Sequence, residues 1–420
     1  MLGQSDESAL RVNSPLIAPA VSQPSTAEIN PSPPAVVVAA LIAGALVGAA
    51  LWIDARADNG PTLALSLILG SAFGFVLQRS RFCFFCAIRE WLDERNPSGI
   101  LAILAALAVG LAGYAVVFGA WLPDPSTGRL APDAFIGPVG PVLILGGVAF
   151  GAGMAISGSC VSAHLYRLGE GSPMAPFALI GTAAGFTLGF LAWNSLYLGS
   201  VSAAPIIWLP NHIGYAGTFM GSLAVLALLA LALIRHLKAR PDPAAEIRPV
   251  SSVFVRRWPG WLGGLAVGAI GTVAYLRVAP LGVTAELGGR ARQGATAAGL
   301  LPERLLGLDT LRGCAALARD VLLTPNGLFV AGMILAALAA ALAAGQFRPA
   351  RPSVSQVLRG LIGGILLGFG AMVALGCSVG TLLSGIMAGA LSGWVFAVAM
   401  LVGLVVTLRI GRRLNLLPKA

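Results

Sequence analysis

The chain has 420 residues, of which 57% are apolar and only 10% are charged, and its formal net charge is +10. A soluble domain carries about 25% charged and 45–50% apolar residues, so this composition excludes a soluble globular enzyme, a disordered chain and a nucleic-acid-binding protein. It predicts an all-α, polytopic membrane protein in contact with a lipid bilayer and with no nucleic acid partner. The positive charge follows from the enrichment of Lys and Arg in cytoplasmic loops.

The N-terminal segment 1–34 differs from the rest of the chain. It contains six Pro and six Ser and no apolar run, which is typical of a disordered tail. It also lacks the basic stretch followed by an apolar stretch that marks a cleaved signal peptide. Residues 1–34 are therefore expected to form a disordered N-terminal tail.

Apolar segments of nearly membrane length recur after this tail. A spanning helix needs about 20 mostly apolar residues, and ten segments approach that length: 35–53, 62–78, 99–122, 141–158, 175–198, 214–234, 260–278, 326–345, 359–376 and 391–408. The chain is expected to divide into a first membrane repeat at 35–234, a basic cytoplasmic loop at 235–258, a second membrane repeat at 259–410 and a basic C-terminal tail at 411–420.

The basic residues favour one orientation of these helices. If the N-terminus is inside and ten helices alternate, the inside segments hold 19 Lys and Arg residues and the outside segments hold 7. Both termini are therefore expected in the cytoplasm. The outside connection 279–325 departs from the rule with five arginines. It is expected to be either a half-helix that mirrors 79–98 and attracts anions, or a plain surface helix.

Two stretches of the sequence repeat each other. Segment 142–181 aligns without gaps on segment 359–398, which pairs Gly147 with Gly364, Gly151 with Gly368, Gly153 with Gly370, Cys160 with Cys377 and Phe177 with Trp394. Helices one to five then pair with helices six to ten, and because five is odd the two halves have opposite topology. The pattern predicts about ten transmembrane helices in a 5+5 inverted repeat with broken helices, which is an architecture of transporters.

Cysteines lie at equivalent breaks of the two repeats. The breaks read Ser-Gly-Ser-Cys at 157–160 and Gly376-Cys377-Ser378, and the short segments that follow are 161–171 and 378–389. These segments are too short to span a membrane and are expected to be re-entrant half-helices. A half-helix N-terminus directs free N–H groups into a cavity and suits an anion, and a thiol adds a weak donor. The alternative is that each Cys fills a tight turn as a small apolar residue.

A third candidate site is the run Gln78-Arg79-Ser80-Arg81-Phe82-Cys83-Phe84-Phe85-Cys86. Its Cys-x-x-Cys spacing can bind zinc or perform redox chemistry. Zinc takes four ligands, and no His is near in sequence, so no metal site is predicted. The arginines either hold an anion at the inner mouth or follow the positive-inside rule. Cys86, Gln78 and His164 are secondary candidates for the path; His164 is otherwise a core histidine, and Cys314 is expected only to pack.

Several kinds of chemistry have no counterpart in the sequence. There is no Gly-rich phosphate-binding loop, the expected spans hold almost no Asp or Glu, and no Ser/His/Asp or paired-carboxylate arrangement is visible. These features argue against nucleotide hydrolysis by that loop and against a proton relay through buried carboxylates. The sequence predicts a transporter rather than an enzyme, without a cofactor.

Three motifs resemble the YeeE/YedE family of sulfur transport proteins: QRSRFC at 78–83, SGSC at 157–160, which departs from the family pattern at Ser159 and Ala163, and LGCSVGTLLSGIMAGALSGW at 375–394. The resemblance implies a compact inverted-repeat bundle in which thiosulfate passes inward along a narrow path with three cysteine thiols. By motif these are Cys377, Cys160 and Cys83, with Arg81 in the matching motif. It also implies delivery to a TusA-like cytoplasmic sulfur-carrier protein.

The resulting hypothesis is an inner-membrane importer of thiosulfate or a related sulfur-containing anion, acting as a channel or a secondary carrier. Its expected substrate path consists of Cys83, Cys160, Cys377, Arg81, Gly376 and Ser378. One alternative is a membrane sulfurtransferase that relays sulfane sulfur as a cysteine persulfide, which requires a reactive thiolate. Another is a soft-metal permease that uses the same thiols, although the scarcity of buried acids argues against it.

Overall fold

The computed structural model describes residues 32–56, 58–236, 253–308, 311 and 324–417. The long helices of this part are α1 (Pro33–Arg56), α2 (Gly60–Ser80), α4 (Ser98–Trp121), α5 (Pro141–Ser157), α7 (Ala175–Gly199), α8 (Leu209–Ile234), α10 (Gly260–Arg277), α12 (Pro325–Ala343), α13 (Val354–Val373) and α15 (Leu391–Arg413). The shorter elements are α3 (Phe84–Glu94), η1 (Pro125–Thr127), α6 (Val161–Gly169), η2 (Val201–Ala203), α11 (Val283–Ala297), the π-helix η4 (Ser378–Ser384) and α14 (Gly385–Met387).

The all-α membrane fold is confirmed. The described part contains nine helical stretches that are long and apolar enough to cross a membrane, and each coincides with one of the ten expected segments. The remaining segment, 260–278, forms α10, which is not among the nine. Its 18 residues include five glycines and Arg277, and these lower its mean hydropathy. The short helices expected at 161–171 and 378–389 are present as α6 and as η4 with α14.

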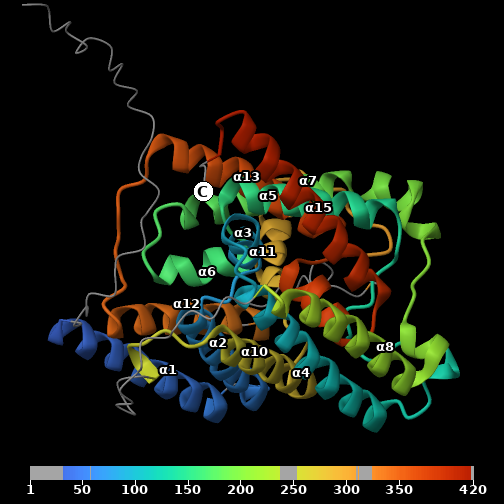
Figure 1. Cartoon of the computed structure of the whole chain (residues 1–420), viewed down its shortest axis with the longest axis horizontal. Coiled ribbons are helices and arrows are strands. Elements are labelled where there is room, and N and C mark those ends of the chain that lie inside the picture. Colours follow the sequence, from blue (N-terminus) through green and yellow to red (C-terminus); the bar gives the residue numbers. More distant parts are fainter. Residues whose placement is uncertain (1–31, 57, 237–252, 309–310, 312–323, 418–420) are drawn as a thin grey trace, which may run out of the picture.

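The long helices form two layers, and the short helices lie between them (Figure 1). In one layer α13 packs against α5 and α7, and α15 packs against α5. In the other layer α12 and α10 pack against α2, and α4 packs against α10. Of the short helices, α6 contacts α7 and α12, α11 contacts the same two helices, and α14 contacts α15 and α4. The breaks in the chain are therefore enclosed by helices on both sides.

Reciprocal contacts relate α5 to α13. A Cβ added at Gly153 would lie 2.7 Å from the backbone nitrogen of Leu367, and a Cβ added at Gly370 would lie 2.6 Å from that of Phe150. The alignment of the two repeats carries Gly153 to Gly370 and Phe150 to Leu367, so the two contacts are images of one another. A two-fold axis through the crossing produces this pattern. Only glycine allows so close an approach of the two backbones.

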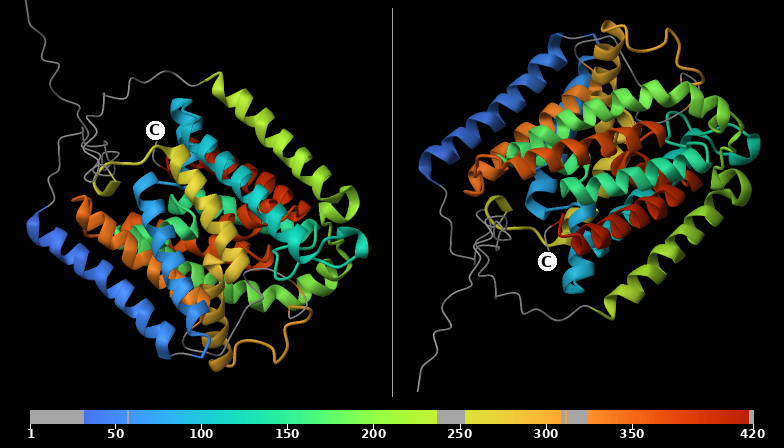
Figure 2. Two further views of the ribbon diagram at one scale, coloured as in Figure 1. Left: turned by 90° about the horizontal axis from the view of Figure 1, so that it is seen from below. Right: turned by 90° about the horizontal axis from the view of Figure 1, so that it is seen from above.

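Two long helices lie at the periphery. In Figure 2, α1 and α8 occupy opposite flanks of the bundle. Only 17% of the most apolar stretch in each of them is buried. Large apolar side chains such as Leu41, Leu51, Met220 and Leu228 are more than half exposed. These flanks are the surfaces that a lipid bilayer would cover.

Arginines gather at one face of the bundle, here called the basic face. It is formed by the C-terminal ends of α2, α5, α8, α12 and α15, and its arginines include Arg79, Arg81, Arg89, Arg95, Arg167, Arg348, Arg359 and Arg412. A hydrogen bond and an ion pair connect chain segments at this face: Arg359 donates to Ile156 O at 3.2 Å, and Arg412 pairs with Asp93. The arginine–carbonyl contact joins the start of α13 to the end of α5, so these related helices run in opposite directions.

Two segments depart from the expected domain boundaries. Helix α15 continues to Arg413, so the start of the tail expected at 411–420 is helical. In the expected loop 235–258, residues 253–258 return to the bundle, where Trp258 N donates to Arg79 O at 3.0 Å. Most of the predicted N-terminal tail, together with Cys314, lies outside the described residues.

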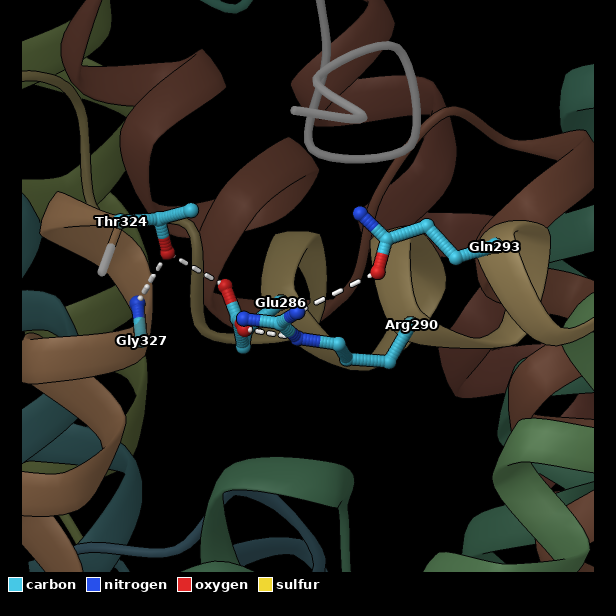
Figure 3. A network of polar contacts seen from close by, with 5 residues as sticks. All are labelled: Glu286, Arg290, Gln293, Thr324 and Gly327. Atoms are coloured by element: carbon cyan, nitrogen blue, oxygen red, sulfur yellow. Dashed lines mark hydrogen bonds and ion pairs between the residues drawn. The ribbon is translucent and has the colours of Figure 1, made fainter. Parts of the chain in front are cut away.

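The expected half-helix in the connection 279–325 is α11, whose side chains anchor it to the start of α12. Figure 3 shows Glu286 accepting hydrogen bonds of 2.6 Å from both Arg290 and Thr324, while Thr324 caps α12 through the 2.8 Å hydrogen bond from Gly327 N. Arg290 is therefore balanced by a carboxylate. Its charge serves the packing of α11 rather than standing free to attract an anion.

Candidate anion path

Three buried cysteines occupy the N-cap positions of three short helices. Cys83 is the N-cap of α3, Cys160 that of α6 and Cys377 that of η4, and all three have extended backbone conformations. Their exposed fractions are 4%, 1% and 1%. Since the first N–H groups of a helix have no partner within it, each thiol lies at the positive end of a helix dipole. The sequence indicated this arrangement for Cys160 and Cys377, and the structure extends it to Cys83.

The same backbone turn precedes each cysteine by two residues. The turn residues have left-handed conformations, with φ of 51° at Arg81, 73° at Gly158 and 58° at Leu375. Each ends a long helix and redirects the chain into a short one. This conformation costs a residue with a Cβ about 1–2 kcal/mol, so tertiary packing must hold Arg81 and Leu375 in place. Such strain concentrates at functional positions.

The starts of the three short helices converge on Cys160. The sulfur of Cys160 lies beside the Cys83 thiol and the Ser378 side chain, and 3.1 Å from Ser162 Oγ. Cys83 in turn lies beside Cys86. A line of thiols and hydroxyls thus runs from the start of η4, through the start of α6, into the first turn of α3. Residues that are far apart in the sequence supply it.

Several buried polar groups without a hydrogen-bond partner lie on or next to the short helices α6, α11 and η4, and others lie on the long helices α8 and α15. Among the described residues they include the hydroxyls of Ser159, Thr284 and Ser384 and both ring nitrogens of His164. An unpaired buried polar group costs about 1–3 kcal/mol, and native proteins normally supply a partner. The groups on α6, α11 and η4 would find partners in a polar solute that passes between these short helices. His164, a secondary candidate from the sequence, is one of these groups.

Gln78 and Arg79 are held in a polar network at the basic face. Arg79 donates to the carbonyls of Phe254, Val255 and Ala340 and to the side-chain oxygens of Gln78 and Gln346, at 2.6–3.2 Å. The amide of Gln78 donates to Gln346 and Glu170. These contacts fasten the end of α2 to α12 and to the segment 253–258. The network therefore stabilises the helix end beside the thiol line.

The remaining expected path residues have different surroundings. Arg81 is exposed at the basic face. Gly376 is buried, and a Cβ there would collide with the side chain of Thr381. Glycine at this position thus allows the η4 turn to fold back directly over the break. Among the described residues, no group of three or more His, Cys, Asp or Glu could hold a metal ion.

A family model for sulphur transport matches residues 79–406, a range that contains all three cysteine caps. The chain belongs to this family. Its YeeE/YedE members are transporters, so the protein is a transporter rather than an enzyme, as the sequence predicted. Helix α1 and most of α2 precede the matched region.

Similar members of the sulphur transport family include two named thiosulfate transporters. TsuA of Escherichia coli (strain K12) is 28% identical over 361 residues, which is 80% of this chain and 91% of that protein. TsuA of Spirochaeta thermophila is 29% identical over 359 residues, covering 80% of this chain and 95% of its own. The probable transporter YedE of Escherichia coli (strain K12) is 27% identical over 210 residues, or 47% of this chain and 48% of that protein.

One side chain beside the line of thiols was not predicted from the sequence. Arg167 lies on α6, two turns after Cys160, and is one of the 19 basic residues that the sequence assigns to the inside segments. Its Nη2 donates to Cys86 Sγ at 3.1 Å, and its Nη1 lies 3.5 Å from Gly158 O. The available signal was the position of a basic residue seven places after a cysteine on a short helix. The contact with Cys86 depends on packing between α6 and α3, which no local pattern encodes.

Proposed function

We propose that this protein imports thiosulfate or a related sulfur-containing anion, which moves past Cys377, Cys160 and Cys83 in that order. The observation that carries the proposal is the convergence of three short helices, each with a buried cysteine at its N-cap position, at one point inside the bundle. Three positive helix ends favour an anion there. The names of the two thiosulfate transporters similar to this chain support the choice of substrate.

The donor set suits a thiosulfate ion. Its terminal sulfur is soft and polarisable, and a thiol can donate a hydrogen bond to it, while the sulfonate oxygens accept from backbone N–H groups. Because thiols are weak donors, no single site holds the ion strongly. Conduction needs several sites that bind well enough to admit an ion and weakly enough to release it. A series of thiols meets that requirement.

The charge distribution supports the direction. We infer that the basic face is cytoplasmic, because arginines concentrate on the cytoplasmic side of membrane proteins. Both described chain ends, at α1 and after α15, then lie in the cytoplasm of a bacterium, with the protein in the inner membrane. Cys377, whose break connects to the opposite face, would receive the ion first. A TusA-like sulfur carrier is the expected acceptor at the basic face.

The decisive experiment is uptake of labelled thiosulfate into proteoliposomes. We expect uptake by the wild type and at least an approximately tenfold loss in Cys160→Ala and in Cys377→Ala, since one lost hydrogen bond to a charged group is worth about 1.5–3 kcal/mol. Thr182→Ala is the matched control: its hydroxyl is equally buried but donates to Ala178 O within α7. No uptake by the wild type, or undiminished uptake in both cysteine variants, would refute the proposed path.

Mass spectrometry separates transport from sulfur relay. A transporter that binds the ion without covalent chemistry leaves all thiols unmodified after exposure to thiosulfate. A persulfide on Cys83 or Cys160 after that exposure would instead show that the protein transfers sulfane sulfur, and the transport proposal would be wrong in its mechanism.

A further inference from the structure

We propose that Arg167 and Cys86 form a fourth anion-binding station, at the end of the thiol line nearest the basic face. The station would bind a sulfur oxyanion dianion and pass it from the thiols to the cytoplasmic exit. This inference rests on the proposed function, because it extends the same path. It assigns a role to a cysteine for which the family resemblance offers no counterpart.

The geometry continues the line beyond Cys83. Cys86 lies one turn further along α3, next to Cys83 and partly buried. Arg167 extends from the last turn of α6 back toward the start of that helix, where it contacts Gly158 O, and its second terminal nitrogen reaches the Cys86 sulfur. A guanidinium and a thiol therefore face the same point. An ion leaving Cys83 would meet both.

The charge of Arg167 is not paired with a carboxylate, in contrast to that of Arg412, and it has fewer oxygen acceptors than that of Arg79. Arg412 pairs with the carboxylate of Asp93, while Arg79 donates to three carbonyls and two side-chain oxygens. Arg167 has no carboxylate within ion-pairing distance among the described residues; its partners are the Cys86 sulfur at 3.1 Å, Gly158 O at 3.5 Å and the side chain of Tyr166, none of which carries a full negative charge in its neutral form.

A thiol is a weak acceptor, and removing a cation from water is costly unless a counter-charge replaces the solvent. A dianion would supply that counter-charge and would displace a weak contact rather than a strong one. The planar guanidinium also matches the geometry of an oxyanion, to which it can donate two parallel hydrogen bonds. The site is thus built for an anionic guest.

Transport kinetics test the station directly. In thiosulfate uptake, we expect Arg167→Gln to raise KM or lower the maximal rate about tenfold or more, and Arg167→Lys to retain part of the function because it keeps the charge. Arg359→Gln is the matched control, since Arg359 is also partly buried at the basic face and donates to a backbone carbonyl. Wild-type kinetics in Arg167→Gln would overturn the inference while leaving the proposed function intact.

A second measurement does not depend on transport. Anionic and cationic methanethiosulfonate reagents are applied to the full-length protein, and peptide mass spectrometry measures the modification of Cys86. The tryptic peptide between Arg81 and Arg89 carries both Cys83 and Cys86, so fragment ions must locate the label. We expect the ratio of anionic to cationic labelling at Cys86 to fall about tenfold in Arg167→Gln. Changes in the intrinsic reactivity of the thiol affect both reagents and cancel in this ratio.

The two measurements keep the proposals distinguishable. If the wild type transports no thiosulfate, the proposed function fails, and an unchanged labelling ratio would also overturn the station. A lowered ratio without transport would still support an anion site at Arg167, whose guest would differ from thiosulfate. A lowered ratio that Arg359→Gln reproduces would overturn the station, because it would indicate a general effect of the charge of the basic face.

Discussion

Replacing Gly370 by Ala tests the crossing of α5 and α13, on which the position of both repeat-related thiols depends. The new methyl group would lie 2.6 Å from the backbone oxygen of Gly146 and from the backbone nitrogen of Phe150. Backbone atoms cannot rotate away, so the two helices must separate. Overpacking by one methyl group costs about 1–3 kcal/mol. Because α5 leads to Cys160 and α13 leads to Cys377, we expect the same separation to impair uptake.

A control variant in α1 separates the cost of this close contact from the gain in helix propensity. An Ala in place of a helical Gly gains about 1 kcal/mol of helix propensity. At Gly48 nothing lies within 4 Å of an added Cβ, so Gly48→Ala should show that gain alone. Gly370→Ala has the same gain in helix propensity, which cancels in the comparison, so unfolding by SDS in mixed micelles, followed by circular dichroism, should separate the two variants by the overpacking cost alone, about 1–3 kcal/mol.

The two-fold relation adds a further requirement to this prediction. Gly153→Ala introduces the image contact, 2.7 Å from Gly363 O, and should destabilise the protein by a similar amount. The double variant should be less destabilised than the sum, because one separation of the helices relieves both contacts. Stability equal to that of Gly48→Ala for either single variant would refute the crossing. Strict additivity would refute the shared axis.

Three further predictions concern single contacts. The methyl group added by Gly158→Ala would meet no atom within 4 Å. The loss of stability should therefore be that of the left-handed backbone conformation alone, about 1–2 kcal/mol. An unchanged midpoint in the same SDS titration would contradict the turn before Cys160. Arg79→Gln removes donors from three carbonyls and should lower the free energy of unfolding by about 2–4 kcal/mol. Limited proteolysis should then cleave the segment 253–258 faster than in the wild type. An unchanged rate of cleavage would argue against the network. Thr324→Val removes the cap of α12 and a hydrogen bond to Glu286. In thermal unfolding it should lower the stability of the protein by about 1–2 kcal/mol, and uptake should be retained after refolding at low temperature. Loss of uptake in a fully folded variant would give Thr324 a role in the path.

The expected spans agree with the structure because they rest on local properties. Runs of apolar residues as long as a bilayer is thick have few alternatives to a helix, so α4 or α12 can be located without knowledge of their neighbours. The one departure, α10, also has a local cause in its glycines. The alignment of the two repeats that pairs Gly153 with Gly370 could likewise be found in the sequence, because a close helix contact that occurs twice requires glycine in both copies.

The candidate site was visible only in part. The positions of Cys160 and Cys377 at chain breaks predicted capped short helices, and the family motif added Cys83. The roles of the arginines could not be assigned in the same way. Arg79 and Arg81 stand two residues apart, yet the first lies fully buried in a network and the second is exposed. Arg167 looked like an ordinary loop charge.

The amino-acid sequence by itself determined the membrane class, the helices, the repeat and the short helices that begin at cysteines. All of these depend on hydropathy, on glycine spacing and on a break between apolar runs, which are properties of contiguous residues. Only the tertiary structure decided that Cys83, Cys86, Cys160 and Ser378 form one line and that Arg167 reaches it. Those contacts join α3, α6 and η4, which are far apart in the sequence. They form because the packing of the two helix layers brings the three chain breaks into contact.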